Sequence, residues 1–495
     1  MTHAHESRKW IALALLSLTQ FILVIDVSIV NVALNAIQGA LKFSEANLQW
    51  ILSAYTLTFG GLLLLGGRMA DMFGRRKVFM VGLVVFVLGS ALCGFAQSEI
   101  MLILSRALQG VGAAIISPGA LSILMTTFEE GAERNKALGI WGAIAGVGGA
   151  VGVLAGGFLV QYLSWRWVFL LNLPIGIIVL FLVPRFVDES RGHGHPRLDL
   201  AGSFTITGGL ALLIYGLTRG ETHGWGQPLT ITLLVVAVLL VLGSIALERV
   251  VHDPLLPLGI FRNRNVTGAN VVGFLLGASI FAMFFFLSLY MQQVLRYSAV
   301  GVGTRYLLFA VVIIVAAGLS QGLVTKIGVR PVMAIGMFAL TVGLVYFTLL
   351  RVNGTYPRDL VPGFIIAGIG LGFSFVPVSI AALSGVHHRM AGVASGLINT
   401  SQQVGGAVGI AILSAVATHV AGNHIDDAAK AAVAAGKDPR AAAAAAQPHA
   451  LVDGFTTAFW VSAAMAVIGL ACTLFIIRPI TPQEASAAAH AGSAV

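Results

Sequence analysis

An acid that could exchange a proton and an arginine that could pair with it lie deep inside separate apolar segments. Asp26 is in the first long apolar run, and Arg106 is in a run that begins near Glu99. A carboxylate at membrane depth costs several kcal/mol unless it is paired, solvated or protonated. Asp26 is about 24 Å along its helix, and Arg106 is about 10 Å along a helix of opposite direction, so both reach a similar depth. We expect a pair in which Asp26 is the proton site, with a static ion pair as the alternative.

The composition is that of a polytopic α-helical membrane protein. The 495 residues are 57% hydrophobic and 10% charged, with a mean hydropathy of +0.92. A soluble domain is about one quarter charged. Apolar runs of about 20 residues exclude a β-barrel, whose spans are shorter and alternate. The net charge of +9 comes from residues between the apolar runs, so no nucleic-acid partner is expected.

About fourteen spans of about 20 residues are predicted, which gives an all-α fold. Their limits are 10–34, 48–70, 77–97, 99–127, 136–160, 166–187, 200–218, 229–250, 267–293, 303–325, 331–350, 361–384, 391–420 and 452–477. Gly74 and Arg76 follow the second span, and Gly328 and Arg330 repeat them after the tenth. If spans seven and eight are an insertion, the plan is two six-span halves.

The expected domains follow from these limits. They are an N-terminal segment 1–9, a six-helix bundle 10–187, two inserted spans with linkers 188–265, a second six-helix bundle 266–478, and a tail 479–495. The second bundle contains an external loop 421–454, which is alanine-rich and is expected to include a surface helix or to be partly disordered. Lys and Arg set the orientation, because they are enriched in cytoplasmic loops. With the N-terminus inside, cytoplasmic loops hold roughly twice as many as external ones. They are Arg8, Lys9, Arg68, Arg75, Arg76, Lys77, Arg134, Lys136, Arg185, Arg191, Arg197, Arg249, Arg262, Arg264, Lys326, Arg330, Arg389 and Arg478. We therefore expect a multi-pass protein of the cytoplasmic membrane with both termini inside.

The connection between spans two and three is a candidate conformational latch. It reads Gly67-RMADMFGRR-Lys77, and the candidate residues are Gly67, Asp71, Gly74, Arg75 and Arg76. Asp71 could cap a nearby helix N-terminus or pair with Arg, and such contacts would join the two halves in one state only. The alternative is charge anchoring alone. Glu129, Glu130 and Glu133 are further candidate partners for the basic residues, with a solvated charge run as the other interpretation.

Span five contains an unusual concentration of glycine. The residues are Gly139, Gly148, Gly152, Gly156 and Gly157. Small residues let helix backbones approach closely, so a bendable, tightly packed seam is predicted, and plain packing is the alternative.

A cavity for an amphipathic ligand would need amides and aromatic rings. The candidates are Asn31, Gln109, Phe285, Tyr290, Gln293, Asn399, Gln402 and Gln403. Their alternative is a lipid-facing or core position. No GxxxxGK[ST] sequence or Cys/His cluster occurs, so we expect no catalytic residue, no metal and no cofactor, and an ion gradient as the energy source.

From about residue 10 to 478 the sequence resembles the major facilitator superfamily, and within it the fourteen-span drug:proton antiporters. The resemblance rests on Asp26 and Asn31 in span one, on the latch residues, on Arg106, Gln109, Gly110 and Gly112 in span four, and on the span-five glycines. It implies that Arg106 takes part in proton transfer and that the glycine motif serves antiport. Val153 replaces the usual proline, and Thr325 stands in the second half where Asp71 stands in the first.

These features predict a proton-coupled exporter of hydrophobic or amphipathic compounds such as drugs or antibiotics, working by alternating access. Its expected partners are such a substrate, protons and membrane lipid, and it is expected to be a monomer and not an enzyme. No acid lies well inside spans nine to fourteen, which favours neutral, zwitterionic or singly charged substrates. The alternatives are a lipid or dedicated natural-product exporter, and a scaffold or sensor without transport.

Overall fold

The structure is a computed structural model that describes residues 2–43, 50–129, 132–190, 200–247, 249, 257–386, 390–435 and 438–479. Helices account for the ordered elements of these ranges, which contain no strand. Glu130, Arg191, Arg197, Arg389 and the tail from residue 480 lie outside the described residues. The expected all-α fold is confirmed.

Each of the predicted spans overlaps a described helix. The first are α1 (Thr2–Leu41), α3 (Trp50–Phe73), α4 (Arg75–Gly94), α5 (Glu99–Thr127), α6 (Ala132–Tyr162), α7 (Trp167–Leu170) and α8 (Asn172–Phe186). Then come α9 (Leu200–His223), α10 (Pro228–Leu247), α11 (Arg264–Leu289), α12 (Ala299–Ile327), α13 (Val329–Phe347), α14 (Val361–Leu383), α15 (Ala391–Ala434) and α16 (Pro439–Phe475). Short 3₁₀ or π segments cover Leu258–Arg262, Tyr290–Val294 and Tyr356–Leu360.

Length and composition make most of these helices membrane spans. Among the described residues, 12 helices are long and apolar enough to cross a membrane, and shorter apolar helices cover Val151–Tyr162 in α6 and Thr205–Leu217 in α9. Helices are favoured because they satisfy every backbone polar group internally where no water is present. Serine side chains start two of them: Ser98 accepts from the Met101 amide at the start of α5, and Ser298 from the Gly301 amide at the start of α12.

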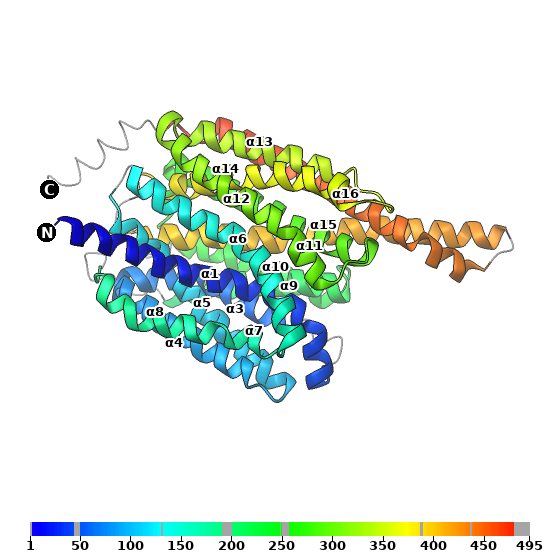
Figure 1. Cartoon of the computed structure of the whole chain (residues 1–495), viewed down its shortest axis with the longest axis horizontal. Coiled ribbons are helices and arrows are strands. Elements are labelled where there is room, and N and C mark those ends of the chain that lie inside the picture. Colours follow the sequence, from blue (N-terminus) through cyan, green and yellow to red (C-terminus); the bar gives the residue numbers. More distant parts are fainter. Residues whose placement is uncertain are drawn as a thin grey trace.

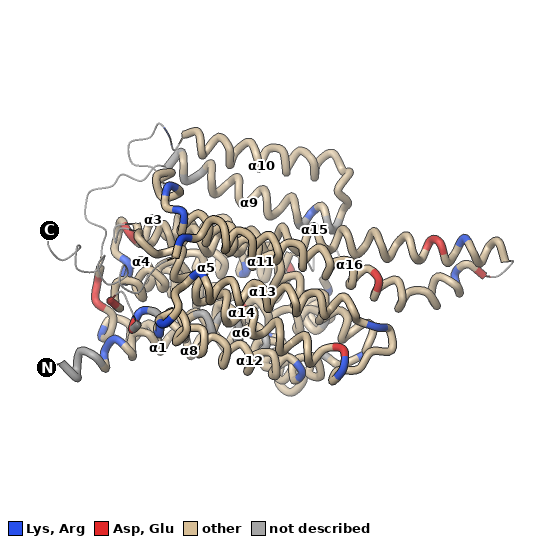
Figure 2. The backbone as a smooth tube through the Cα atoms, turned by 90° about the horizontal axis from the view of Figure 1, so that it is seen from above, with Lys and Arg blue, Asp and Glu red and all other residues tan. Residues whose placement is uncertain are grey.

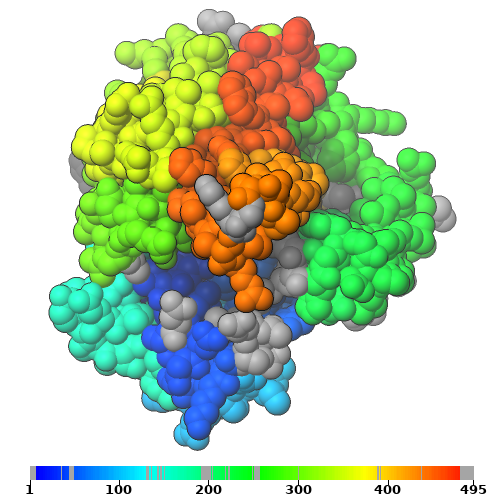
Figure 3. All heavy atoms as spheres, turned by 90° about the vertical axis from the view of Figure 1, so that its right-hand side faces the viewer, coloured from blue at the N-terminus to red at the C-terminus, as the bar shows by residue number. Residues whose placement is uncertain are grey.

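The helices form one long bundle in which the start of α1 and the end of α16 lie on the same side (Figure 1). We call this side the termini end and the opposite side the hairpin end. Charged residues lie mostly toward the two ends of the bundle, with few along its middle (Figure 2). The early helices α1 to α8 pack together, as do α11 to α16, and the two groups meet where α6 packs on α12 and α3 on α15. The inserted α9 packs on α3 and α15, and α10 packs on α9 at one edge of the bundle (Figure 3).

The internal repeat seen in the sequence has a structural counterpart. Gly74 joins α3 to α4 with φ 106°, and Gly328 joins α12 to α13 with φ 89°, which are values that L side chains rarely adopt. Arg76 donates to the backbone oxygen of Val187, just past α8, and Arg330 donates to that of Leu474 near the end of α16. In each half, the turn after the second helix is therefore hydrogen-bonded to the end of the last helix.

The external segment 421–454 contains the expected surface helix, but it differs from the predicted loop because most of its length is helical. α15 continues to Ala434 and α16 begins at Pro439, so the segment is a helical hairpin that projects beyond the rest of the bundle (Figure 1). Its alanine-rich composition explains the difference, because alanine has the highest helix propensity. His424 and Asp453 join the two helices at 2.8 Å. Seen from the hairpin end, the hairpin stands in front of the middle of the bundle (Figure 3).

Candidate functional site

Asp26 and Arg106 form a buried ion pair between α1 and α5. The Arg106 Nη1 atom donates to the Asp26 Oδ2 atom at 2.6 Å, and the two side chains are 0% and 1% exposed. The predicted equal depth of these residues is thus confirmed by direct contact. Removing one partner of such a pair leaves an uncompensated buried charge, which costs about 3–5 kcal/mol. Each member of the pair therefore depends on the other.

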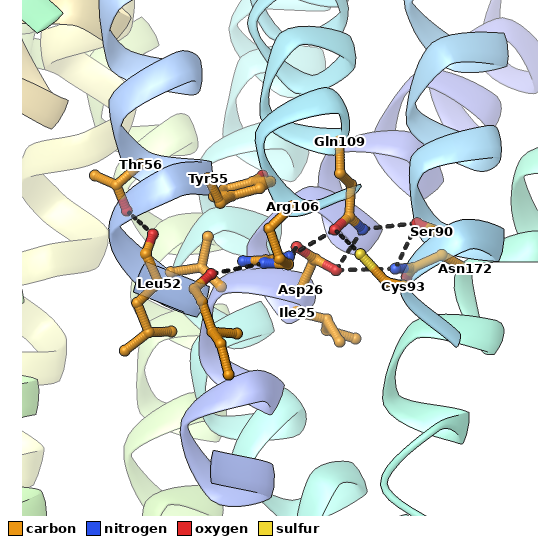
Figure 4. Close-up of polar contacts among 12 residues, drawn as sticks. Ile25, Asp26, Leu52, Tyr55, Thr56, Ser90, Cys93, Arg106, Gln109 and Asn172 are labelled. Carbon is orange, nitrogen blue, oxygen red and sulfur yellow. Dashed lines mark hydrogen bonds and ion pairs between the residues drawn. The ribbon is translucent and has the colours of Figure 1, made fainter. Parts of the chain in front are cut away.

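Two amide side chains donate hydrogen bonds to the other carboxylate oxygen of Asp26 (Figure 4). Gln109 Nε2 donates to Asp26 Oδ1 at 2.7 Å, and Asn172 Nδ2 donates to the same atom at 3.0 Å. Both amides also donate to the Ser90 hydroxyl, at 2.6 and 3.3 Å respectively. Helices α4, α5 and α8 thus hold the carboxylate of α1 in one orientation, and all of these side chains are fully buried.

The guanidinium of Arg106 is held on its remaining sides as well. Its Nε atom donates to the Ile51 backbone oxygen at 2.9 Å, and Nη1 also donates to Gln109 Oε1 at 2.6 Å. The ring of Tyr55 lies 4.3 Å from the guanidinium carbon. A cation over an aromatic face is stabilised further once it is removed from water. α3 therefore supplies a carbonyl and a ring to a site built mainly by α1 and α5.

The structure corrects the prediction that Gln109 lines a cavity and adds several residues to the ion-pair site. Gln109 is not on a cavity wall, because its amide is used by Asp26, Arg106 and Ser90 inside the first group of helices. A signal was available, since residues three apart share a helix face and Gln109 follows Arg106 at that spacing. Tyr55, Ser90 and Asn172 were not singled out from the sequence as residues of this site. A single polar residue in an apolar run does not reveal its partner.

Asp71 joins the two halves of the chain at the termini end. Its Oδ1 accepts from Arg75 Nη2 at 2.8 Å, and the carboxylate also accepts from the backbone amides of Gly392 and Val393 at 3.1 Å each. Those amides are the free donors at the start of α15, where the helix dipole favours a negative charge. Asp71 and Arg75 are 3% and 2% exposed. Both contacts named in the sequence prediction, the cap and the pairing with Arg, are present together.

The rest of the latch segment packs closely around these contacts. Gly67 faces the backbone of Gly392, and a Cβ atom on either residue would collide with the backbone oxygen of the other. Glu189 caps the start of α4 through the amides of Arg76 and Lys77, at 3.1 and 3.2 Å. In the second half, Thr325 stands at the position of Asp71, and its hydroxyl donates to the Gln321 oxygen of the same helix. Of these two related turns, only the first therefore has a carboxylate that caps another helix.

The acidic partners of the basic residues are mostly different from those expected. Lys9 does pair with Glu133, at 3.2 Å. Arg8 instead pairs with Asp188 at 2.7 Å, and Arg76 lies 3.8 Å from Glu189. Both of these acids follow α8, whereas the expected partners follow α5. Glu189 was missed by sequence reasoning. The signal was its position directly after an apolar helix, beside the basic segment.

The span-five glycines line two helix contacts of α6. Gly148, Gly152 and Gly156 face α1 at Val24, Ser28 and Ile29, while Gly139 and Gly157 face α12 at Gln321 and Val300. The Ser28 hydroxyl donates to the Ile25 oxygen at 3.0 Å. α6 is therefore wedged between the helix that carries Asp26 and a helix of the second half, so a shift of α1 would act directly on the contact between the halves.

The other predicted cavity residues are dispersed. Asn31 and Gln293 are exposed, and Phe285 is 40% exposed. Tyr290 is 0% exposed, and its hydroxyl donates to the Arg351 oxygen at 2.7 Å, so it is a packing residue of the second half rather than a cavity residue. Asn399, Gln402 and Gln403 are half-buried on α15. Asn399 donates to the Ser395 oxygen of its own helix.

Comparison with known proteins agrees with these features. The chain is 38% identical over 495 residues to the puromycin resistance protein pur8 of Streptomyces alboniger, covering 99% of this chain and 94% of that protein. It is 41% identical over 409 residues to the cephamycin export protein CmcT of Amycolatopsis lactamdurans, covering 82% and 84% of the two chains. The structure of the proton:xylose symporter XylE shares the fold, with a TM-score of 0.64 and 16% identity over 98% of this chain and 99% of that one. The Major Facilitator Superfamily profile matches residues 16–410, and the chain belongs to this superfamily of membrane transporters.

Proposed function

We propose that the protein is a proton-coupled exporter of hydrophobic or amphipathic small molecules, including antibiotics. The observation that carries the proposal is the fully buried pair of Asp26 and Arg106, because an intramembrane acid is costly and is retained where it moves or binds charge. The relatives named as a puromycin resistance protein and a cephamycin export protein support the substrate class. The proton gradient is the energy source, and no cofactor or second subunit takes part.

In the proposed cycle, a proton from outside neutralises Asp26 and removes its attraction for Arg106. The guanidinium is then left as an uncompensated buried charge, so the helices around it rearrange toward the inward-facing state. Substrate binding, or loss of the proton to the cytoplasm, restores the ion pair. α6 transmits the movement because its glycines pack against both α1 and α12.

The latch defines which state of the cycle is stabilised. Asp71 bonds to the start of α15 and so favours a closed termini end. We assign that end to the cytoplasm because of the Lys and Arg enrichment near both chain termini. Substrate enters when the Asp71 contacts break, and leaves on the other side when they form again. Labelling of single cysteines from either side of the membrane tests the orientation.

The test of the proposal is proton-driven efflux from vesicles that carry Asp26→Asn. This variant is nearly isosteric and cannot exchange a proton. We expect loss of gradient-driven export, while exchange of substrate without a gradient is retained as evidence of folding. Full retention of coupled export in the folded variant would falsify the role of Asp26.

A second candidate is a dedicated exporter of one natural product, and the similarity to the cephamycin export protein favours it. A screen of structurally unrelated compounds in cells without their own pumps separates the two. Protonophore-sensitive efflux of many compounds supports the polyspecific exporter, and efflux of one chemical class supports the dedicated one.

A further inference from the structure

The two amides that hold Asp26 differ in how many of their atoms are engaged. Gln109 is engaged at both: Oε1 accepts from Arg106, and Nε2 donates to Asp26 and Ser90. Asn172 donates through Nδ2 to the same two partners, but its buried Oδ1 atom has no hydrogen-bond partner among the described residues. Asn172 is 0% exposed, so water does not satisfy this oxygen from the surface. Buried acceptors of this kind are rare in folded proteins.

Protonation of Asp26 gives that idle oxygen a partner. An ionised carboxylate only accepts hydrogen bonds, whereas a carboxylic acid also donates one. A proton added to Asp26 Oδ1 would face the N–H groups of both Gln109 and Asn172, which donate to that atom, and a proton directed at either is a contact between donors. Turning the Asn172 amide by about 180° places Oδ1 there as an acceptor, and this terminal torsion is broad and roughly two-fold.

The rest of the network can adjust to the turned amide without the transfer of any other proton between groups. The Ser90 hydroxyl, which accepts from Asn172 in this structure, can donate to the turned Oδ1 atom and still accept from Gln109. Gln109 cannot turn, because Arg106 holds its Oε1 atom. One amide atom of Asn172 lacks a partner in either orientation, so the proton on Asp26 decides between the two.

We propose that Asn172 is a positioning residue that turns its amide with the protonation state of Asp26 and so stabilises both states of the proton site. This inference rests on the proposed proton coupling. The other titratable or charged groups facing Asp26 are Arg106 from α5, Tyr55 from α3 and Cys93 from α4. α6 presents glycines to α1, α7 has no charged residue, and the basic residue of α8 lies in its last turn.

The test compares Asn172→Thr with Asn172→Val, which have the same shape. The threonine hydroxyl can donate to a carboxylate and accept from an acid, and valine can do neither. The readout is the external pH at which proton-driven efflux is half-maximal. Hydrogen bonds to charged groups are stronger than neutral ones, so valine destabilises the ionised state more and should move this midpoint upward by about one pH unit. Threonine should stay within about half a unit of wild type.

The same pair in the Asp26→Asn background is the control. Proton-driven efflux is lost in this background, so the comparison uses gradient-free substrate exchange, whose rate should be the same for both substitutions because no proton is exchanged. Equal midpoints for valine, threonine and wild type, or equal shifts for valine and threonine, would overturn the role of Asn172. A flat pH profile in wild type would instead overturn the proposed proton coupling. Gradient-free substrate exchange shows that each variant is folded, and if valine is not, Asn172→Ser and Asn172→Ala give the same comparison.

Discussion

Asp71 lies 321 residues before Gly392 in the chain, yet its carboxylate accepts the backbone N–H of that glycine at 3.1 Å. This contact crosses from the first half of the fold to the second, and it satisfies a donor at the start of α15 that no helical carbonyl can reach. The same carboxylate pairs with Arg75, so one acid supports a turn and an interface at once.

Asp71→Ala should open the termini end. The substitution removes the cap and leaves the Arg75 guanidinium without its acid, which together destabilise the closed state by several kcal/mol. Spin labels at Phe73→Cys and Ile327→Cys, exposed by 52% and 47%, report the distance between the halves. Cys472→Ser is included to remove a partly exposed thiol. We expect longer distances and at least tenfold slower export.

The matched control for Asp71→Ala is Thr325→Ala. Thr325 stands at the equivalent position of the second half and bonds only within its own helix, so its loss should leave the distances unchanged. Asp71→Asn should give an intermediate result, because asparagine also caps helices but lacks the charge. Unchanged distances and export in Asp71→Ala would contradict the latch.

Arg106→Lys should slow proton-driven export at least tenfold although the charge is kept. The guanidinium reaches Asp26, Gln109 and the Ile51 oxygen at the same time. A compact ammonium on a flexible chain cannot reproduce this geometry. Arg8→Lys is the control, because Arg8 pairs with Asp188 at an exposed site where the geometry matters little. Wild-type efflux rates in Arg106→Lys would show that only the charge is required.

The sequence allowed the ion pair to be predicted because depth along a helix follows from a fixed rise per residue. It also allowed Asp71 to be identified as a cap or a partner of Arg, since few roles suit an acid at a helix end. It could not identify α15 as the capped helix, because that choice depends on packing between distant segments. The free amide oxygen of Asn172 was equally beyond reach, since helix periodicity does not report which atoms remain unpaired. Two of the predicted cavity residues were misassigned for the same reason, because the polar groups of Gln109 and Tyr290 form hydrogen bonds inside the protein.

Gly152→Ala should weaken the contact between α6 and α1. An added Cβ atom would collide with the Ser28 hydroxyl oxygen, whereas a Cβ at the neighbouring Gly149 would only touch the Phe284 ring at 3.8 Å. Overpacking of this kind costs about 1–3 kcal/mol. Thermal unfolding in detergent should show a lower midpoint for Gly152→Ala than for Gly149→Ala, with export reduced in parallel.

A second substitution tests the cause of that loss. Ser28→Ala removes the colliding oxygen, so the double variant should recover part of the stability of Gly152→Ala. No recovery would mean that the glycine serves helix bending instead of close packing with α1.

The ring of Tyr55, and not its hydroxyl, should matter for the proton site. The hydroxyl is buried and has no hydrogen-bond partner among the described residues, while the ring lies 4.3 Å from the Arg106 guanidinium carbon. Tyr55→Phe keeps the aromatic face and should export at nearly the wild-type rate. Tyr55→Leu keeps a shorter apolar side chain but loses the cation–π contact, which contributes about 2 kcal/mol when removed from water. The export rates of the two variants should therefore differ by about tenfold or more, since about 1.4 kcal/mol corresponds to a factor of ten. Loss of export in Tyr55→Phe would show that the hydroxyl acquires a partner in another state of the cycle, and equal rates for phenylalanine and leucine would remove the ring from the mechanism.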